Sequence, residues 1–62
     1  MIEGERVKLI KKTFIHQGVF ILTNSVVEIV EVSEDGIAVV YNDKEGNPHI
    51  IKNLQATDLA PL

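Results

Sequence analysis

Residues 25–42 read SVVEIVEVSEDGIAVVYN, and this stretch decides the fold. Two runs rich in Val and Ile, 25–32 and 37–42, flank the polar cluster 33–36. β-Branched side chains are stiff about χ1 and pack well on a pleated surface, so each run is predicted to be a strand. Because Asp and Gly tolerate a positive φ, Asp35-Gly36 is predicted to form a tight turn. The stretch therefore predicts an antiparallel hairpin.

The run 25–32 carries apolar side chains on both of its faces. Side chains alternate between the two faces of a strand. One face holds Val26, Glu28, Val30 and Val32, and the other holds Val27, Ile29 and Glu31. This pattern is typical of a long, coiled strand that is shared by two halves of a barrel.

Further strands are predicted on either side of this hairpin. Residues 5–12 alternate apolar and basic side chains, and Ile10 breaks the alternation, which predicts a bend or a bulge there. Residues 48–53 form the fourth strand. Residues 54–58 are typical of a single helical turn, and 59–62 form a short last strand, in which a proline favours a sheet edge.

The connection between the first two strands, 13–24, is too apolar for an ordinary loop. It contains two Phe, two Ile, one Val and one Leu. We expect it to fold over one end of the barrel, with Gly18 allowing a sharp turn.

Composition supports one small all-β domain over residues 1–62. Val and Ile together make 16 of the 62 residues, hydrophobic residues make up 45%, and there is no cysteine to form a disulfide or a thiolate metal site. Residues 1–13 hold four basic and two acidic residues, for +2, whereas 14–62 hold two basic and seven acidic residues, for −5. The sum of −3 describes a mild dipole and not a polyanion-binding surface.

The organisation resembles that of an SH3-like small β-barrel. Residues 5–10 resemble the opening strand of such domains, and 24–30 stand where KOW-type modules carry a Gly-x-Val-x-x-Ile run. Residues 39–46 resemble the V-x-F-x-D-x-x-G hairpin, and 58–62 resemble the D-L-x-x-L ending. The resemblance implies an all-β, five-stranded SH3-like barrel with one short helical turn before the last strand.

The chain departs from both families at functional positions. Asn24-Ser25 replaces the KOW glycine, and the basic loops of many KOW modules are missing. No tryptophan is present to form the groove of proline-binding SH3 domains. Ribosomal contacts and PxxP recognition are therefore not expected.

Catalysis is not expected either. His16 and His49 are far apart in sequence, the serines lack a nucleophile-elbow motif, and no Gly-rich phosphate loop is present. Glu28 and Glu31 lie three residues apart on a strand, so they point to opposite faces and cannot form a catalytic pair. We therefore expect a non-enzymatic protein without cofactor or metal.

Two functions from different classes are open. The first is a protein-interaction module or accessory subunit that binds a partner through the 14–22 loop and the neighbouring Tyr41 surface. The residues expected to bind are Phe14, Ile15, His16, Phe20, Tyr41 and His49. A barrel interior of this size holds few aromatic side chains. We therefore expect at least one of Phe14, Ile15 and Phe20 to be exposed beside Tyr41 or His49.

The alternative is weak nucleic-acid binding by the basic first strand. The cations are Arg6, Lys8, Lys11 and Lys12, of which Arg6, Lys8 and Lys12 would share the outward face. Three or four phosphate contacts give weak, salt-sensitive binding. Self-association through the strand 25–32 is compatible with either function, and a homodimer stays open. With no export signal, no run of 18 apolar residues and no cysteine, a cytoplasmic location is expected.

Overall fold

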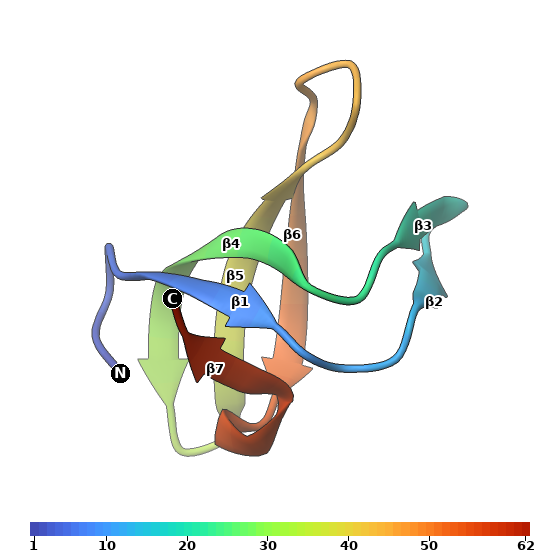
Figure 1. Ribbon diagram of the computed structural model, residues 1–62. Helices are drawn as coiled ribbons and strands as arrows, with labels where there is room; N and C mark the ends of the chain where they lie inside the picture. Colours follow the sequence, from blue (N-terminus) through green and yellow to red (C-terminus); the bar gives the residue numbers. More distant parts are fainter.

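The computed structural model describes all residues 1–62 and contains seven strands and one 3-10 turn (Figure 1). The elements are β1 (Arg6–Leu9), β2 (Phe14–His16), β3 (Val19–Ile21), β4 (Ser25–Ser33), β5 (Gly36–Asn42), β6 (Pro48–Leu54), η1 (Ala56–Asp58) and β7 (Leu59–Pro61). The all-β class is therefore confirmed. No helix is long and apolar enough to cross a bilayer.

Five strands form one antiparallel sheet in the order β6-β5-β4-β1-β7, and β2 and β3 form a separate two-stranded sheet. The strand β4 pairs with β1 through its first half, 25–28, and with β5 from Glu28 onward. It is thus the long, shared strand that the sequence predicts. The sheet ends at two edge strands, β6 and β7, which are not paired with each other, so its hydrogen bonds do not close it into a barrel.

The first strand is shorter than predicted. It ends at Leu9, because its partners there, Ser25 and Leu59, are the residues at which β4 and β7 begin. Ile10 therefore lies beyond the strand and not in a bulge, and its N–H donates to the carbonyl of Asp58 at 2.8 Å.

The bulge lies in β4 instead. Ile29 pairs with Val39 and Glu31 pairs with Ala38, so Val30 is left without a partner. Because an extra residue reverses the alternation, Val32 lies on the same side as its partner, the buried Ile37. The predicted faces of this strand are therefore correct only up to Val30.

The core lies on the concave side of the sheet. Its ten buried side chains are Val7, Leu9, Ile21, Val27, Ile29, Ile37, Val39, Ile51, Leu54 and Leu59. No polar side chain is buried. Every strand except β2 supplies at least one of these residues, so the fold depends on dispersed aliphatic packing and not on an aromatic centre.

The hairpin between β4 and β5 is confirmed, but its turn is one residue earlier than predicted. Ser33 pairs with Gly36, which leaves Glu34 and Asp35 as the two loop residues. Of these four residues only Gly36 has a positive φ, at +141°. A Cβ placed on Gly36 would lie 3.0 Å from the Cα of Asn53. A side chain at this position is therefore disfavoured for two reasons, the positive φ and the close backbone contact.

A matched pair of substitutions separates these two reasons. Gly36→Ala is expected to lower the free energy of unfolding by about 1–3 kcal/mol, because it combines an unfavourable φ with a backbone clash. Gly46 has φ +84°, and a Cβ added there would have no atom within 4 Å, so Gly46→Ala tests conformation alone and should cost less. Urea unfolding measures both. An equal loss would show that the Asn53 backbone moves away without cost.

Candidate functional site

The predicted 13–24 connection forms a β-hairpin that the sequence did not predict as strands. Phe14 pairs with Ile21, Ile15 with Phe20, and His16 with Val19. The loop residues Gln17 and Gly18 have φ of +52° and +80°. Two consecutive positive φ values match the type I′ turn, whose twist suits a two-residue hairpin. The sharp turn expected at Gly18 is therefore confirmed.

Side-chain and backbone hydrogen bonds hold the base of this hairpin. The N–H of Thr23 donates to Thr13 Oγ1 at 3.2 Å, and Thr23 Oγ1 donates to the carbonyl of Lys11 at 2.9 Å. The N–H of Asn24 donates to the carbonyl of Leu9 at 2.7 Å. These bonds connect both ends of the hairpin to the end of β1.

The two faces of the hairpin differ sharply. Ile21 is fully buried, and Phe14 and Val19 pack against the core from the same face. On the opposite face, the cross-strand pair Ile15 and Phe20 is exposed, at 63% and 64%. One aromatic therefore completes the core and the other faces solvent, as the limited interior volume predicts.

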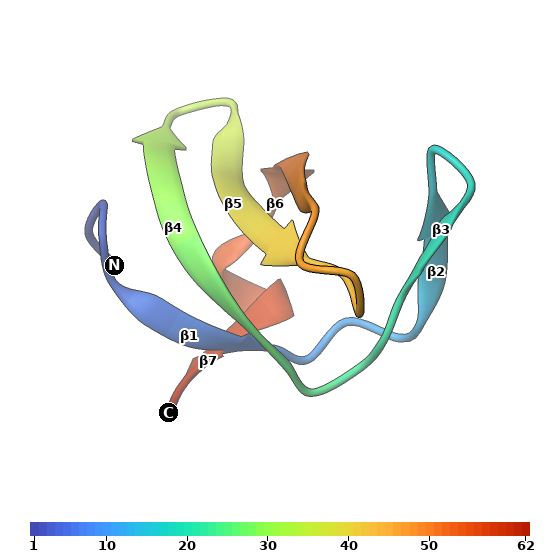
Figure 2. The same cartoon turned by 90° about the horizontal axis from the view of Figure 1, so that it is seen from above.

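A groove of about 510 Å³ lies between the hairpin and the loop that joins β5 to β6. Its lining residues are Gly18, Val19, Phe20, Leu22, Tyr41, Asp43, Lys44 and Glu45. Figure 2 shows the hairpin standing apart from the main sheet and facing this loop. Phe20 and Tyr41 thus lie on opposite walls of one groove.

One carboxylate determines the shape of the loop wall. The N–H groups of Glu45 and Asn47 both donate to Asp43 Oδ1 at 2.9 Å. The backbone N–H of Asp43 donates to the carbonyl of Asn47 at 3.0 Å, and that of Gly46 donates to the carbonyl of Asp43 at 3.0 Å. The side chain of Asp43 therefore replaces two backbone acceptors that the loop lacks.

His49 of β6 anchors this carboxylate. Its Nε2 lies 2.8 Å from Asp43 Oδ2, and both side chains are 20% exposed. The hydrogen bond from His49, followed by that from the Asn47 N–H, lowers the pKa of Asp43 below its ordinary value of 3.8. The His49–Asp43 contact is the one contact in the protein between a basic and an acidic side chain within 4.0 Å.

The structure distributes the predicted partner-binding residues over three places. Phe20 and Tyr41 line the groove, and His49 contacts the Asp43 carboxylate. Ile15 is exposed on the outer face of the hairpin. Phe14 and His16 are half-buried, and Phe14 packs on the core, so neither lines the groove.

The sequence does not predict the loop wall of the groove. Residues 43–47 have the composition of a solvated turn, yet Asp43, Lys44 and Glu45 all line the groove. An Asp at the first position of a Gly-containing turn commonly accepts hydrogen bonds from the N–H groups of the residues that follow. This pattern in the sequence could have predicted that Asp43 orders the loop.

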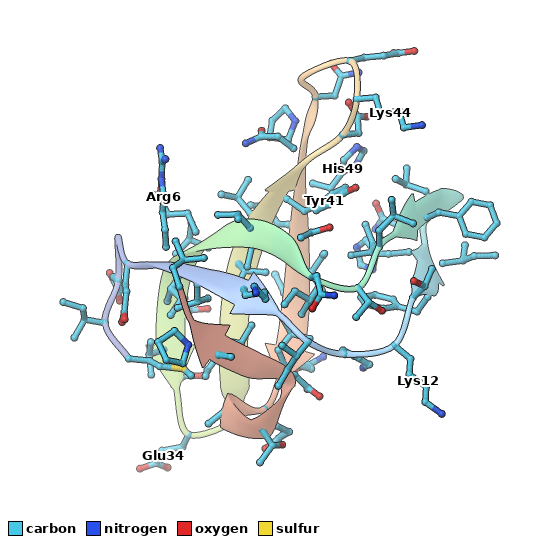
Figure 3. The ribbon with its side chains drawn as sticks, in the orientation of Figure 1. Arg6, Lys12, Glu34, Tyr41, Lys44 and His49 are labelled. Atoms are coloured by element: carbon cyan, nitrogen blue, oxygen red, sulfur yellow. The ribbon has the colours of Figure 1, made fainter.

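The basic residues of the nucleic-acid alternative do not share one face. Arg6 is exposed and Lys8 is half-buried on the outer side of β1. Lys11 and Lys12 lie beyond the strand, and Lys11 Nζ is 5.1 Å from the centroid of the Phe14 ring. Figure 3 shows Arg6 and Lys12 pointing in opposite directions. The expectation that Lys12 shares the outward face of Arg6 is wrong, because the strand ends at Leu9.

The chain was compared with family models, curated proteins and solved structures. No family model, curated protein or solved structure matches the chain. No group of three His, Cys, Asp or Glu side chains converges where it could hold a metal ion.

Acid is expected to loosen the loop wall of the groove. Because the folded-state pKa of Asp43 is lowered, its contribution to stability is present above pH 3.8 and is lost as the pH falls through the lowered value. The amide resonances of Glu45 and Asn47, followed by NMR from about pH 6 to about pH 2, should move with a midpoint below 3.8.

Asp43→Asn is the control for this titration. The variant has no carboxylate at position 43, so the shared low-pH transition of the two amides should disappear. Persistence of that transition in Asp43→Asn would show that another acid controls the loop.

Proposed function

We propose that this protein is a non-catalytic interaction module that binds a partner protein through the hairpin and the adjoining groove. One observation carries the proposal. The cross-strand pair Ile15 and Phe20 is exposed at 63% and 64%, although the other face of the same hairpin already covers the core. The exposed pair therefore has no part in the packing of this domain.

The energetics favour a binding role for these side chains. Burying one large apolar side chain is worth about 1.5–3 kcal/mol, and aromatic anchors dominate protein interfaces. Phe20 and Tyr41 both line the groove, so a partner that occupies it lies next to two aromatic residues. A rigid hairpin with a type I′ turn loses little conformational entropy on binding.

The strand order also supports an SH3-like fold as part of this proposal. A long folded connection between β1 and β4, followed by tight turns, a 3-10 turn and a short last strand, is the arrangement that the sequence resemblance implies.

Substitution should separate binding residues from core residues. Phe20→Ala and Ile15→Ala are expected to change the free energy of unfolding by less than about 0.5 kcal/mol, because both side chains are exposed. Phe14→Ala should cost about 3 kcal/mol, because Phe14 packs against the core. Thermal unfolding of the three variants measures this difference.

Partner capture completes this test. A photo-crosslinking phenylalanine analogue at position 20 should give a specific covalent adduct in cells that make the protein. The same analogue at position 50, where Ile50 is 45% exposed on another strand, is the control. Identical adduct patterns from the two positions, or unfolding caused by Phe20→Ala, would contradict the proposal.

Weak nucleic-acid binding is a second proposal. It is supported by the absence of any carboxylate within ion-pair distance of Arg6, Lys8, Lys11 and Lys12. Their differing directions limit how many can contact one strand of phosphates. Self-association through β4 has less support, since the bulge turns Val32 away from the face of Val26.

An oligonucleotide titration tests the second proposal. Binding to double-stranded DNA should weaken with a slope of about −3 in log K against log salt if three or four phosphates are contacted. Lys8→Glu combined with Lys11→Glu should abolish it, whereas Lys44→Glu, on the groove loop, should not. Absence of binding at low salt would remove this alternative.

A further inference from the structure

The strand β3 presents an unpaired backbone edge. In a hairpin with a two-residue loop, the closing pair, here His16 and Val19, exchanges hydrogen bonds and the next pair does not. That next pair is Ile15 and Phe20, so the N–H and C=O of Phe20 point away from β2. No turn or loop hydrogen bond of the chain reaches either group.

This edge borders the groove. The hairpin contributes Gly18, Val19, Phe20 and Leu22 to the groove lining, and β2 contributes nothing. Since β2 occupies one edge of β3, the residues that line the groove lie toward the other edge. Across the groove stands Tyr41, which lies beyond the last pair of β5 with β4, Val40 with Glu28.

The two free edges of the five-stranded sheet carry features that discourage strand addition. The strand β6 begins at Pro48, carries Lys52 and is distorted by a register shift next to Asn53, whose φ is +63°. The strand β7 is only three residues long and ends at Pro61. Prolines, lysines, bulges and short length are the usual means of blocking an edge.

The strand β3 has none of these means except its short length. No Asp, Glu, Lys or Arg occurs from residue 13 to residue 27, and no proline occurs there either. An apolar, uncharged edge next to a groove is suited to accept another strand.

We propose that the groove binds an extended segment of a partner protein as an added β-strand along β3. This inference rests on the proposed interaction function and specifies how the partner is recognised. The Phe20 N–H donates to a carbonyl of the segment, and the Phe20 C=O accepts from one of its N–H groups. Three residues of β3 give about 10 Å of pairing at ~3.3 Å per residue, so specificity must come largely from side chains.

The chemistry of the walls defines the segment. The hairpin wall is uncharged, so side chains that face Phe20 and Leu22 must be apolar, and they recur at alternate positions of a strand. The loop wall carries two carboxylates, Asp43 and Glu45, against one ammonium, Lys44. A segment with alternate β-branched residues and a nearby Lys or Arg complements both walls.

A single-atom change in the backbone tests this inference. A chain of 62 residues is accessible to total synthesis, which allows the N–H of Phe20 to be replaced by an ester oxygen while the side chain is kept. The same replacement at Ile15 removes the equivalent N–H from the opposite edge of the hairpin and is the matched control. The probe is a displayed library of random twelve-residue peptides, selected on the unmodified protein.

The ester at Phe20 is expected to weaken binding of the selected peptides about 2- to 10-fold, because one hydrogen bond contributes ~0.5–1.5 kcal/mol. The ester at Ile15 should leave their affinity unchanged. The selected sequences should share alternate β-branched residues and a basic residue.

The other outcomes distinguish two failures. Peptides that bind both esters equally, or a proline-rich consensus, would overturn strand addition while leaving the groove as an interaction site. A library that yields no binders, or binders that are insensitive to Phe20→Ala, would overturn the proposed function together with this inference.

Discussion

The whole structure depends on one strand that serves two neighbours. The strand β4 hydrogen-bonds to β1 through its first half and to β5 through its second, and only Glu28 is paired on both sides. Such sharing requires the strand to coil, and the unpaired Val30 supplies the extra local twist. Because the sheet bends at this point, Val7 and Leu9 of β1 meet Val39 and Ile51 of the β5–β6 hairpin in one core. A flat sheet of the same strands would leave its apolar face open to solvent.

The groove depends on a second, smaller constraint. Its walls belong to two segments that share no backbone pairing, the β2–β3 hairpin and the β5–β6 loop. One wall is fixed by the hydroxyl bonds between Thr13, Thr23 and the end of β1. The other is fixed by the Asp43 carboxylate and its contact with His49. The position of each wall is therefore held by polar contacts near the surface together with the packing of Ile21, Phe14, Val19 and Tyr41 in or against the core.

The sequence predicted what depends on local chemistry. The β-branched runs, the turn clusters and the helical turn before the last strand all correspond to observed elements, since neighbouring residues decide them. The end of β1 at Leu9 could not be predicted, because it depends on where β4 and β7 begin. The bulge at Val30 was equally hidden, since only the register against β5 shows the extra residue. For the site, the limited core volume predicted an exposed aromatic, but the contribution of Asp43 to a groove wall required knowing which loops face each other.

The separation of the hairpin from the main sheet leaves a strand edge free for binding. The hydrogen-bond pattern of the β2–β3 hairpin leaves the backbone N–H and C=O of Phe20 on β3 without a strand partner. The main sheet does not pair with this edge, because the hairpin stands apart from it (Figure 2). Water solvates these exposed backbone groups in the free protein, so leaving them unpaired costs little free energy. Their geometry is nevertheless fixed, because Ile21 anchors β3 in the core. An edge that costs little free energy when unpaired, and that is already ordered before binding, meets the physical requirements for recognising an extended chain.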